Sequence, residues 1–394
     1  MYRIPAPSAD ELNDYYTTYG KHVKELIQRV LNPGFYIEKT LGQDATAIKV
    51  RLGIIKGSYT EWFLNHYKED YNLRKLLTSN IEGLLEIINH VQQHVPDFKA
   101  AISKTKYGEV RANQTIDDFN AICRFIFVYS FFDEKFKGET IFNRTEFIKN
   151  RNLTICPYCG ASYIRPSRFD GKIKSTPDID HYFPKSAYPF LALSYYNLIP
   201  SCRGCNTLSN KGIFDPYEII GSKLSLAYPY SFNHESFSFR YRYSPPNQYD
   251  PDSFEINIEY NDKHLRRGYT VGIAIEDMYL HDPDTPRLWG HMMSVRSKHY
   301  RNFARNLFEC YDRECIIRKS EQDSFFANIK NIWMYLSPEM SKTVLKYKFK
   351  KDILFQMLKD EQTQRLNCSL LLHINYRFGG VVKKLLKAIV NKFL

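Results

Sequence analysis

Apolar positions recur at three- and four-residue spacings over long stretches near the start of the chain. This spacing places them on one face of an α-helix. It predicts three helices, at Glu11–Val30, Tyr59–Leu77 and Asn80–His94. Asp117 or Asp118 is then expected to cap a further helix that contains the apolar run 121–132. Residues 1–149 are therefore predicted to form a mostly helical N-terminal domain.

The C-terminal part of the chain has a different pattern. Apolar and polar residues alternate at Phe237–Tyr243 and again at Phe254–Tyr260, which predicts two half-buried strands with a long connection. From about Thr285 the spacing is helical again, and Val381–Leu394 is expected to form a cationic amphipathic helix that packs on the protein or on a partner. Residues 221–394 are thus predicted to hold strands followed by helices.

Residues 150–220 lack long periodic stretches and are rich in Pro, Gly, Cys, Asp and Asn. A small loop-rich domain of this kind usually needs a metal or a partner to hold its shape. It contains two Cys-x-x-Cys pairs, Cys156 with Cys159 and Cys202 with Cys205. Two such pairs supply the four thiolates of a closed tetrahedral zinc shell. We therefore expect a structural zinc site that pins both ends of the segment.

Composition and charge narrow the classes of partner and compartment. The 394 residues include 55 Lys and Arg against 43 Asp and Glu, a formal net charge of +12, which favours a polyanionic partner such as nucleic acid. No apolar run approaches the ~20 residues that span a bilayer, and the first residues do not form a signal peptide. We expect a cytoplasmic protein without a membrane partner. Its cysteines are then thiols or metal ligands, and four are expected in the core: Cys123, Cys310, Cys315 and Cys368.

The segment between the cysteine pairs carries side chains suited to phosphodiester hydrolysis. Asp180 directly precedes His181, and Asn206 directly follows the second pair. Histidine can deprotonate water near neutral pH, and carboxylate or amide oxygens bind the hard cation that stabilises charge on a phosphate. The pattern predicts that His181 is a general base and that Asp180 and Asn206 hold Mg²⁺ or Mn²⁺. Asp178 is expected to be a solvated loop residue, with an outer-shell role as the alternative.

The phrases Asp180-His-Tyr-Phe-Pro-Lys-Ser186 and Tyr196-Asn-Leu-Ile-Pro-Ser-Cys202, followed by Asn206, resemble the HNH motif of His-Me finger (ββα-metal) nucleases in its zinc-bound form. The resemblance implies an α+β fold with a zinc-stabilised ββα-metal core at 150–220. It implies that His181 is the base, that Asp180 and Asn206 are metal ligands, and that Asn197 braces the loop and orients the histidine. Lys211 matches a position where family members often carry a basic residue near the phosphate.

A longer stretch of the sequence also resembles the nuclease subunits of Septu-type and retron-linked anti-phage systems, which work beside an SMC-like or ABC-type ATPase. It comprises Asp180–Ser186, Tyr188-Pro, Leu191-Ala-Leu-Ser194 and Tyr196–Cys202. This resemblance implies a DNA endonuclease of bacterial defence with an ATPase partner. Two alternatives stay open. The same site can serve an RNA nuclease that cuts, for example, tRNA. The chain can also be a zinc-containing nucleic-acid-binding or scaffold protein without catalysis.

Overall fold

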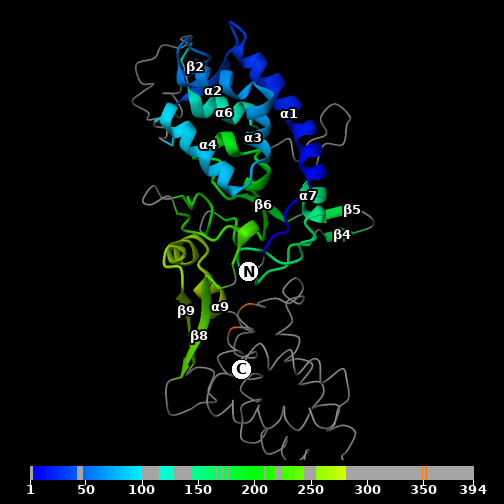
Figure 1. Ribbon diagram of the computed structural model, residues 1–394, viewed down its shortest axis with the longest axis vertical. Helices are drawn as coiled ribbons and strands as arrows, with labels where there is room; N and C mark the ends of the chain where they lie inside the picture. Colours follow the sequence, from blue (N-terminus) through cyan, green and yellow to red (C-terminus); the bar gives the residue numbers. More distant parts are fainter. Residues whose placement is uncertain are drawn as a thin grey trace, which may run out of the picture.

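The chain has an α+β fold that combines helices with small sheets, as predicted (Figure 1). The computed structural model describes residues 3–41, 48–96, 98–99, 115–116, 118–127, 144–165, 167–169, 172–175, 177–207, 210–217, 223–233, 235–243, 254–280, 348 and 352. Several predictions concern residues outside these ranges: the helices after Thr285, the C-terminal amphipathic helix, and Cys310, Cys315 and Cys368. Within the described ranges, no helix is both long enough and apolar enough to cross a bilayer.

The N-terminal part is built on helices that bury one apolar face. They are α1 (Ala9–Leu31), α2 (Tyr59–Tyr67), α3 (Asp70–Thr78), α4 (Ile81–His94), α6 (Phe119–Ile126) and α7 (Arg144–Asn150). The single helix predicted over Tyr59–Leu77 is wrong, because Glu69 adopts an extended backbone and starts α3. The break leaves carbonyl groups at the end of α2, and the Asn72 side chain donates to one of them, the His66 oxygen, at 3.0 Å. Of the two predicted candidates, Asp118 caps α6: its side-chain Oδ1 accepts a hydrogen bond from the Ala121 amide.

A small sheet in the N-terminal part was missed by the helical prediction. Strands β1 (Ile37–Leu41) and β2 (Ile48–Leu52) pair antiparallel, and β2 pairs parallel with the short β3 (Thr115–Ile116). Apolar and polar residues alternate in β2, where Val50 and Leu52 are buried, whereas β1 has three polar residues between Ile37 and Leu41. The two-residue period of a half-buried strand is therefore present in the sequence of β2 only.

The rest of the described chain consists of short elements. They are β4 (Ser167–Phe169), β5 (Lys172–Ser175), β6 (Asp178–His181), the 3₁₀ helices η3 (Pro189–Leu191) and η4 (Tyr195–Asn197), β7 (Leu198–Ser201), the 3₁₀ helix η5 (Pro229–Ser231), β8 (Phe237–Tyr243), β9 (Phe254–Tyr260), α8 (Leu265–Arg267), the π-helical turn η7 (Gly268–Gly272) and α9 (Ile275–Leu280). The two predicted strands are confirmed, since β8 and β9 pair antiparallel over their full length.

One hydrophobic core joins the N-terminal helices to the segment that carries the candidate site. The rings of Tyr15 on α1 and Tyr195 on η4 lie 5.0 Å apart, and those of Phe63 on α2 and Phe190 on η3 lie 5.8 Å apart. Cys123 on α6 is buried in this core, as predicted. In Figure 1 helices α1, α2, α3, α4 and α6 gather at one end with β6 beside them, while the paired strands β8 and β9 extend away. The segment that carries the candidate site is thus packed against the N-terminal helices as well as against its own loops.

Candidate active site beside a four-cysteine cluster

The two cysteine pairs come together as one buried cluster. All four sulfur atoms lie within 4.8 Å of one another, and both the Cys156–Cys205 and the Cys159–Cys202 sulfur pairs are 3.9 Å apart. Tetrahedral zinc with metal–sulfur bonds of about 2.3 Å requires sulfur–sulfur distances of about 3.8 Å. The cluster can therefore hold a metal such as zinc.

Backbone amides around the cluster point toward the sulfur atoms. The amide nitrogens of Ala161, Cys202 and Cys205 each lie 3.4 Å from a cysteine sulfur. Such donors stabilise negative charge on sulfur, the form that binds metal. Hydrogen bonds from the neighbouring thiols, that of Cys156 first, lower the pKa of Cys202. Burial raises the pKa of Cys156, and the hydrogen bond with Cys156 raises that of Cys205. The three backbone amides are therefore the donors that the cluster offers to metal-bound thiolates.

Strands β6 and β7 form a hairpin that places the candidate catalytic residues at its end. Asp180 pairs with Ile199 and His181 with Leu198. The loop between the strands is held by Asn197, whose side chain is fully buried. Its Oδ1 accepts from the Phe183 amide at 2.7 Å, while its Nδ2 donates to the Phe183 carbonyl at 3.2 Å and to the Leu191 carbonyl at 2.9 Å. One amide group thus ties together both ends of the loop that follows His181.

His181 is buried, with 7% of its surface exposed. Its Nε2 atom lies 3.0 Å from the carbonyl oxygen of Ala192. A carbonyl oxygen only accepts, so Nε2 carries the proton, and Nδ1 is the basic nitrogen of the neutral ring. Burial first, and then the charge of Lys185, lower the pKa of His181 to about 3. The imidazole is therefore neutral at physiological pH, which is the form that a general base needs, and the same burial makes it a weaker base than a free histidine.

Asp180 is also buried, and two side chains donate to the same oxygen of its carboxylate. The Tyr158 hydroxyl lies 2.6 Å and the Lys211 ammonium 2.8 Å from Oδ2. Lys211 is fully buried and also donates to the carbonyl oxygen of His181 at 2.7 Å. Burial raises the pKa of Asp180, and the neighbouring Lys211 charge opposes that rise. In this arrangement Lys211 is a buried positive charge that neutralises Asp180, and its ammonium group is not exposed to solvent.

A pocket of about 290 Å³ opens beside these residues. Its lining includes Asp178, Asp180, His181, Lys185, Asn206 and Ile213. The Asn206 side-chain nitrogen lies 3.3 Å from Asp178 Oδ2, so the acid expected to be a solvated loop residue is part of the pocket. Asp178, Asp180 and Asn206 offer oxygen atoms, the donor type that Mg²⁺ and Mn²⁺ prefer. The donor chemistry of the pocket therefore fits a hard divalent cation.

Tyr158 was not predicted as part of this site, and Asp178 was given only the alternative role of an outer-shell acid. Asp178 had a signal, since it stands two positions before Asp180 and the same face of a strand repeats every two residues. Tyr158 had none, because its position inside Cys-Pro-Tyr-Cys does not indicate which group its hydroxyl contacts.

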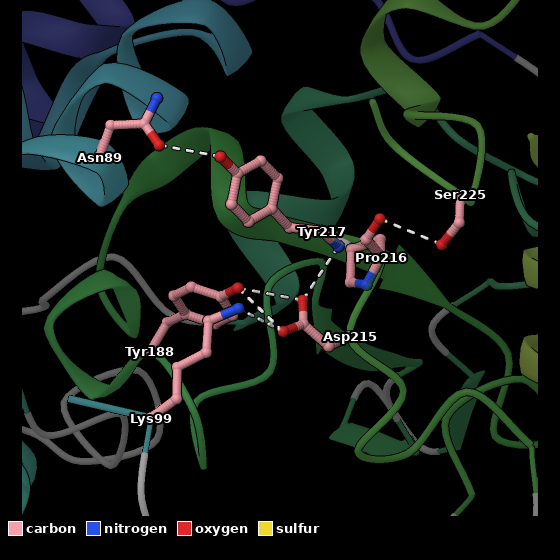
Figure 2. A network of polar contacts seen from close by, with 7 residues as sticks. All are labelled: Asn89, Lys99, Tyr188, Asp215, Pro216, Tyr217 and Ser225. Carbon is pink, nitrogen blue, oxygen red and sulfur yellow. Dashed lines mark hydrogen bonds and ion pairs between the residues drawn. The ribbon is translucent and has the colours of Figure 1, made fainter. Parts of the chain in front are cut away.

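A second polar network holds the segment after Lys211 against the loop after His181 (Figure 2). The Asp215 carboxylate accepts from Lys99 at 2.9 Å, from the Tyr188 hydroxyl at 2.9 Å and from the Tyr217 amide at 3.0 Å. The Tyr217 hydroxyl in turn donates to Asn89 on α4 at 2.8 Å. Two segments that continue from the pocket lining, at Tyr188 and at Asp215–Tyr217, are thereby tied to the helical part of the protein.

Comparisons with protein-family models, with curated protein sequences and with solved structures returned no match.

Proposed function

We propose that the chain is a metal-dependent endonuclease of the HNH type, with residues 150–220 as a zinc-stabilised ββα-metal core. One observation carries the proposal: a neutral buried histidine and three oxygen-bearing side chains line a single pocket. General base and cation ligands are the two components that hydrolysis of a phosphodiester needs. The adjoining four-cysteine cluster supports it, because a metal such as zinc would stabilise the cysteine turns that lie next to these residues.

Each residue has an assigned task in this reaction. His181 takes a proton from water at Nδ1, while Nε2 keeps its own proton and donates it in a hydrogen bond to the Ala192 carbonyl. Asp180 and Asn206, with Asp178 beside Asn206, are assigned as ligands of Mg²⁺ or Mn²⁺. The ion, when bound, supplies positive charge at the phosphate and at the leaving oxygen. Asn197 holds the loop in place, and cleavage leaves a 5′ phosphate and a 3′ hydroxyl.

The sequence resemblance supports DNA as the substrate and a role as a cytoplasmic anti-phage effector beside an SMC-like or ABC-type ATPase. The net charge of +12 is consistent with a polyanionic substrate. An RNA nuclease with the same site, and a binding or scaffold protein without catalysis, are the alternatives that the experiment separates.

The test compares the wild-type protein with His181→Ala and with His264→Ala, which removes an exposed histidine outside the pocket. Each protein is incubated with plasmid DNA, single-stranded DNA and total tRNA in Mg²⁺, Mn²⁺ or EDTA. We expect metal-dependent cleavage that falls by about 10²–10⁴-fold in His181→Ala, the usual loss when a positioned base is removed. His264→Ala should cut like the wild type. Equal cutting by wild type and His181→Ala would refute the assignment of His181, and cutting of tRNA alone would identify an RNA nuclease.

A further inference from the structure

Tyr158 links the four-cysteine cluster directly to the pocket. It stands between Cys156 and Cys159 in the chain, and its side chain is buried. Its hydroxyl reaches Asp180 Oδ2 at 2.6 Å. The backbone around it is closed by a hydrogen bond of 2.8 Å from the Gly160 amide to the Cys156 carbonyl. The fold of this cysteine turn therefore determines where the Tyr158 hydroxyl lies.

The hydrogen bond restrains the orientation of the Asp180 carboxylate. An ionised carboxylate only accepts, so the Tyr158 hydroxyl donates. Lys211 donates to the same oxygen from a second direction, at 2.8 Å. Two buried donors on one oxygen leave the carboxylate little freedom to rotate. Donors of this kind, which contact a metal ligand but not the metal, typically control metal affinity.

We propose that Tyr158 is a positioning residue that couples the metal state of the four-cysteine cluster to the cation-binding carboxylate of Asp180. The inference rests on the proposed function, in which Asp180 is a ligand of the divalent ion. With the cluster filled, the cysteine turn holds the hydroxyl on Asp180. When the cluster loses its metal, the turn is released, the hydrogen bond is lost and the pocket binds its cation more weakly.

The variant that tests this coupling is Tyr158→Phe, which removes the hydroxyl and keeps the ring. Its matched control is Tyr228→Phe, which removes another hydroxyl from a buried tyrosine, one that donates to the Tyr196 carbonyl at 2.6 Å. Both are studied in the full chain loaded with zinc, with zinc content measured by mass spectrometry. Mn²⁺ binding is then titrated by the electron paramagnetic resonance signal of free Mn²⁺, which requires no catalysis. We expect Mn²⁺ affinity to fall about 10–100-fold in Tyr158→Phe, and to be unchanged in Tyr228→Phe.

Coupling between two sites is reciprocal, which provides a second readout. In the wild type, saturating Mn²⁺ should raise the zinc affinity of the cluster, measured by competition with a chelator. In Tyr158→Phe this effect of Mn²⁺ should disappear. Wild-type Mn²⁺ affinity in a fully zinc-loaded Tyr158→Phe protein would overturn the proposal, and so would loss of zinc from that variant. A wild-type protein that binds no Mn²⁺ would instead refute the metal site of the proposed function, and this inference with it.

Discussion

Replacement of Lys211 by Met removes a buried ammonium group but keeps a side chain of similar length. The Lys211 and Asp180 side chains are 0% and 3% exposed, with 2.8 Å between Nζ and Oδ2. In the variant, Asp180 keeps the hydrogen bond from Tyr158 but loses its counter-charge, and the His181 carbonyl loses the donor that Lys211 supplies. The result is a buried carboxylate without a balancing positive charge in contact with it.

The expected loss of stability is large, because the remaining charge stays in the interior. Removing one partner of a buried ion pair typically costs about 3–5 kcal/mol. That cost lowers the folding equilibrium constant by roughly 10²–10⁴, at 1.36 kcal/mol for each factor of ten. Removing both charges together is much less costly, since no unpaired ion is left inside. The double variant Asp180→Asn with Lys211→Met should therefore be more stable than Lys211→Met alone.

The loss should also depend on pH, with a defined sign. Burial already raises the pKa of Asp180 above its ordinary value of 3.8, and Lys211 opposes that rise, so the variant has a higher pKa still. A folded state that holds this proton more tightly than the unfolded state gains stability as the pH falls. The cost of Lys211→Met relative to the wild type is complete above the folded-state pKa that Asp180 has in the variant. It decreases as the pH falls from that pKa to the lower folded-state pKa that Asp180 has in the wild type.

The assay is urea unfolding followed by far-ultraviolet circular dichroism, at several pH values between 5 and 8. Lys75→Met is the matched control, because Lys75 and Glu86 are also 2.8 Å apart but their side chains are 41% and 66% exposed. Exposed pairs contribute about 0–1 kcal/mol. The reasoning is refuted if Lys211→Met loses no more stability than Lys75→Met, or if the double variant is as unstable as Lys211→Met throughout the pH range.

Two further substitutions test other parts of the structure. Cys202→Ser replaces one thiolate of the cluster by a poor zinc ligand, and we expect the zinc content measured by mass spectrometry to fall sharply; full retention of zinc would contradict a four-cysteine site. Glu11→Ala leaves the Arg151 guanidinium, 1% exposed and 2.9 Å from Glu11, without its carboxylate. A loss of about 3–5 kcal/mol is expected in urea unfolding, and an unchanged midpoint would show that this pair does not stabilise α1 against the site segment.

Elements with a strong period were predictable from the sequence, since one face of each is buried. The helices α1 and α4 and the strands β8 and β9 lie where the spacing of apolar residues predicts them. The split between α2 and α3 was not predicted, because apolar spacing continues across the break and Glu69 changes only the backbone direction. The sheet β1–β2 was missed because only β2 alternates, β1 has three consecutive polar residues, and helical stretches on both sides dominated the interpretation.

Within the candidate site, the sequence predicts which residues take part but not which residues contact each other. The Cys pairs and the Asp180–His181 step are local patterns, and the structure brings them to one small region through the β6–β7 hairpin. The partner of Asp180 is not a local property. Asp180 lies on a buried strand between Ile179 and His181, so its negative charge needs a positive partner. By sequence alone, Lys185 and Lys211 are equally good candidates for that partner. Lysines are almost always exposed, so only packing reveals that the aliphatic stem of Lys211 runs through the interior to reach Asp180. To predict such a pair, one must first know that the acid is buried. One must then know the position of every lysine or arginine whose side chain can reach it.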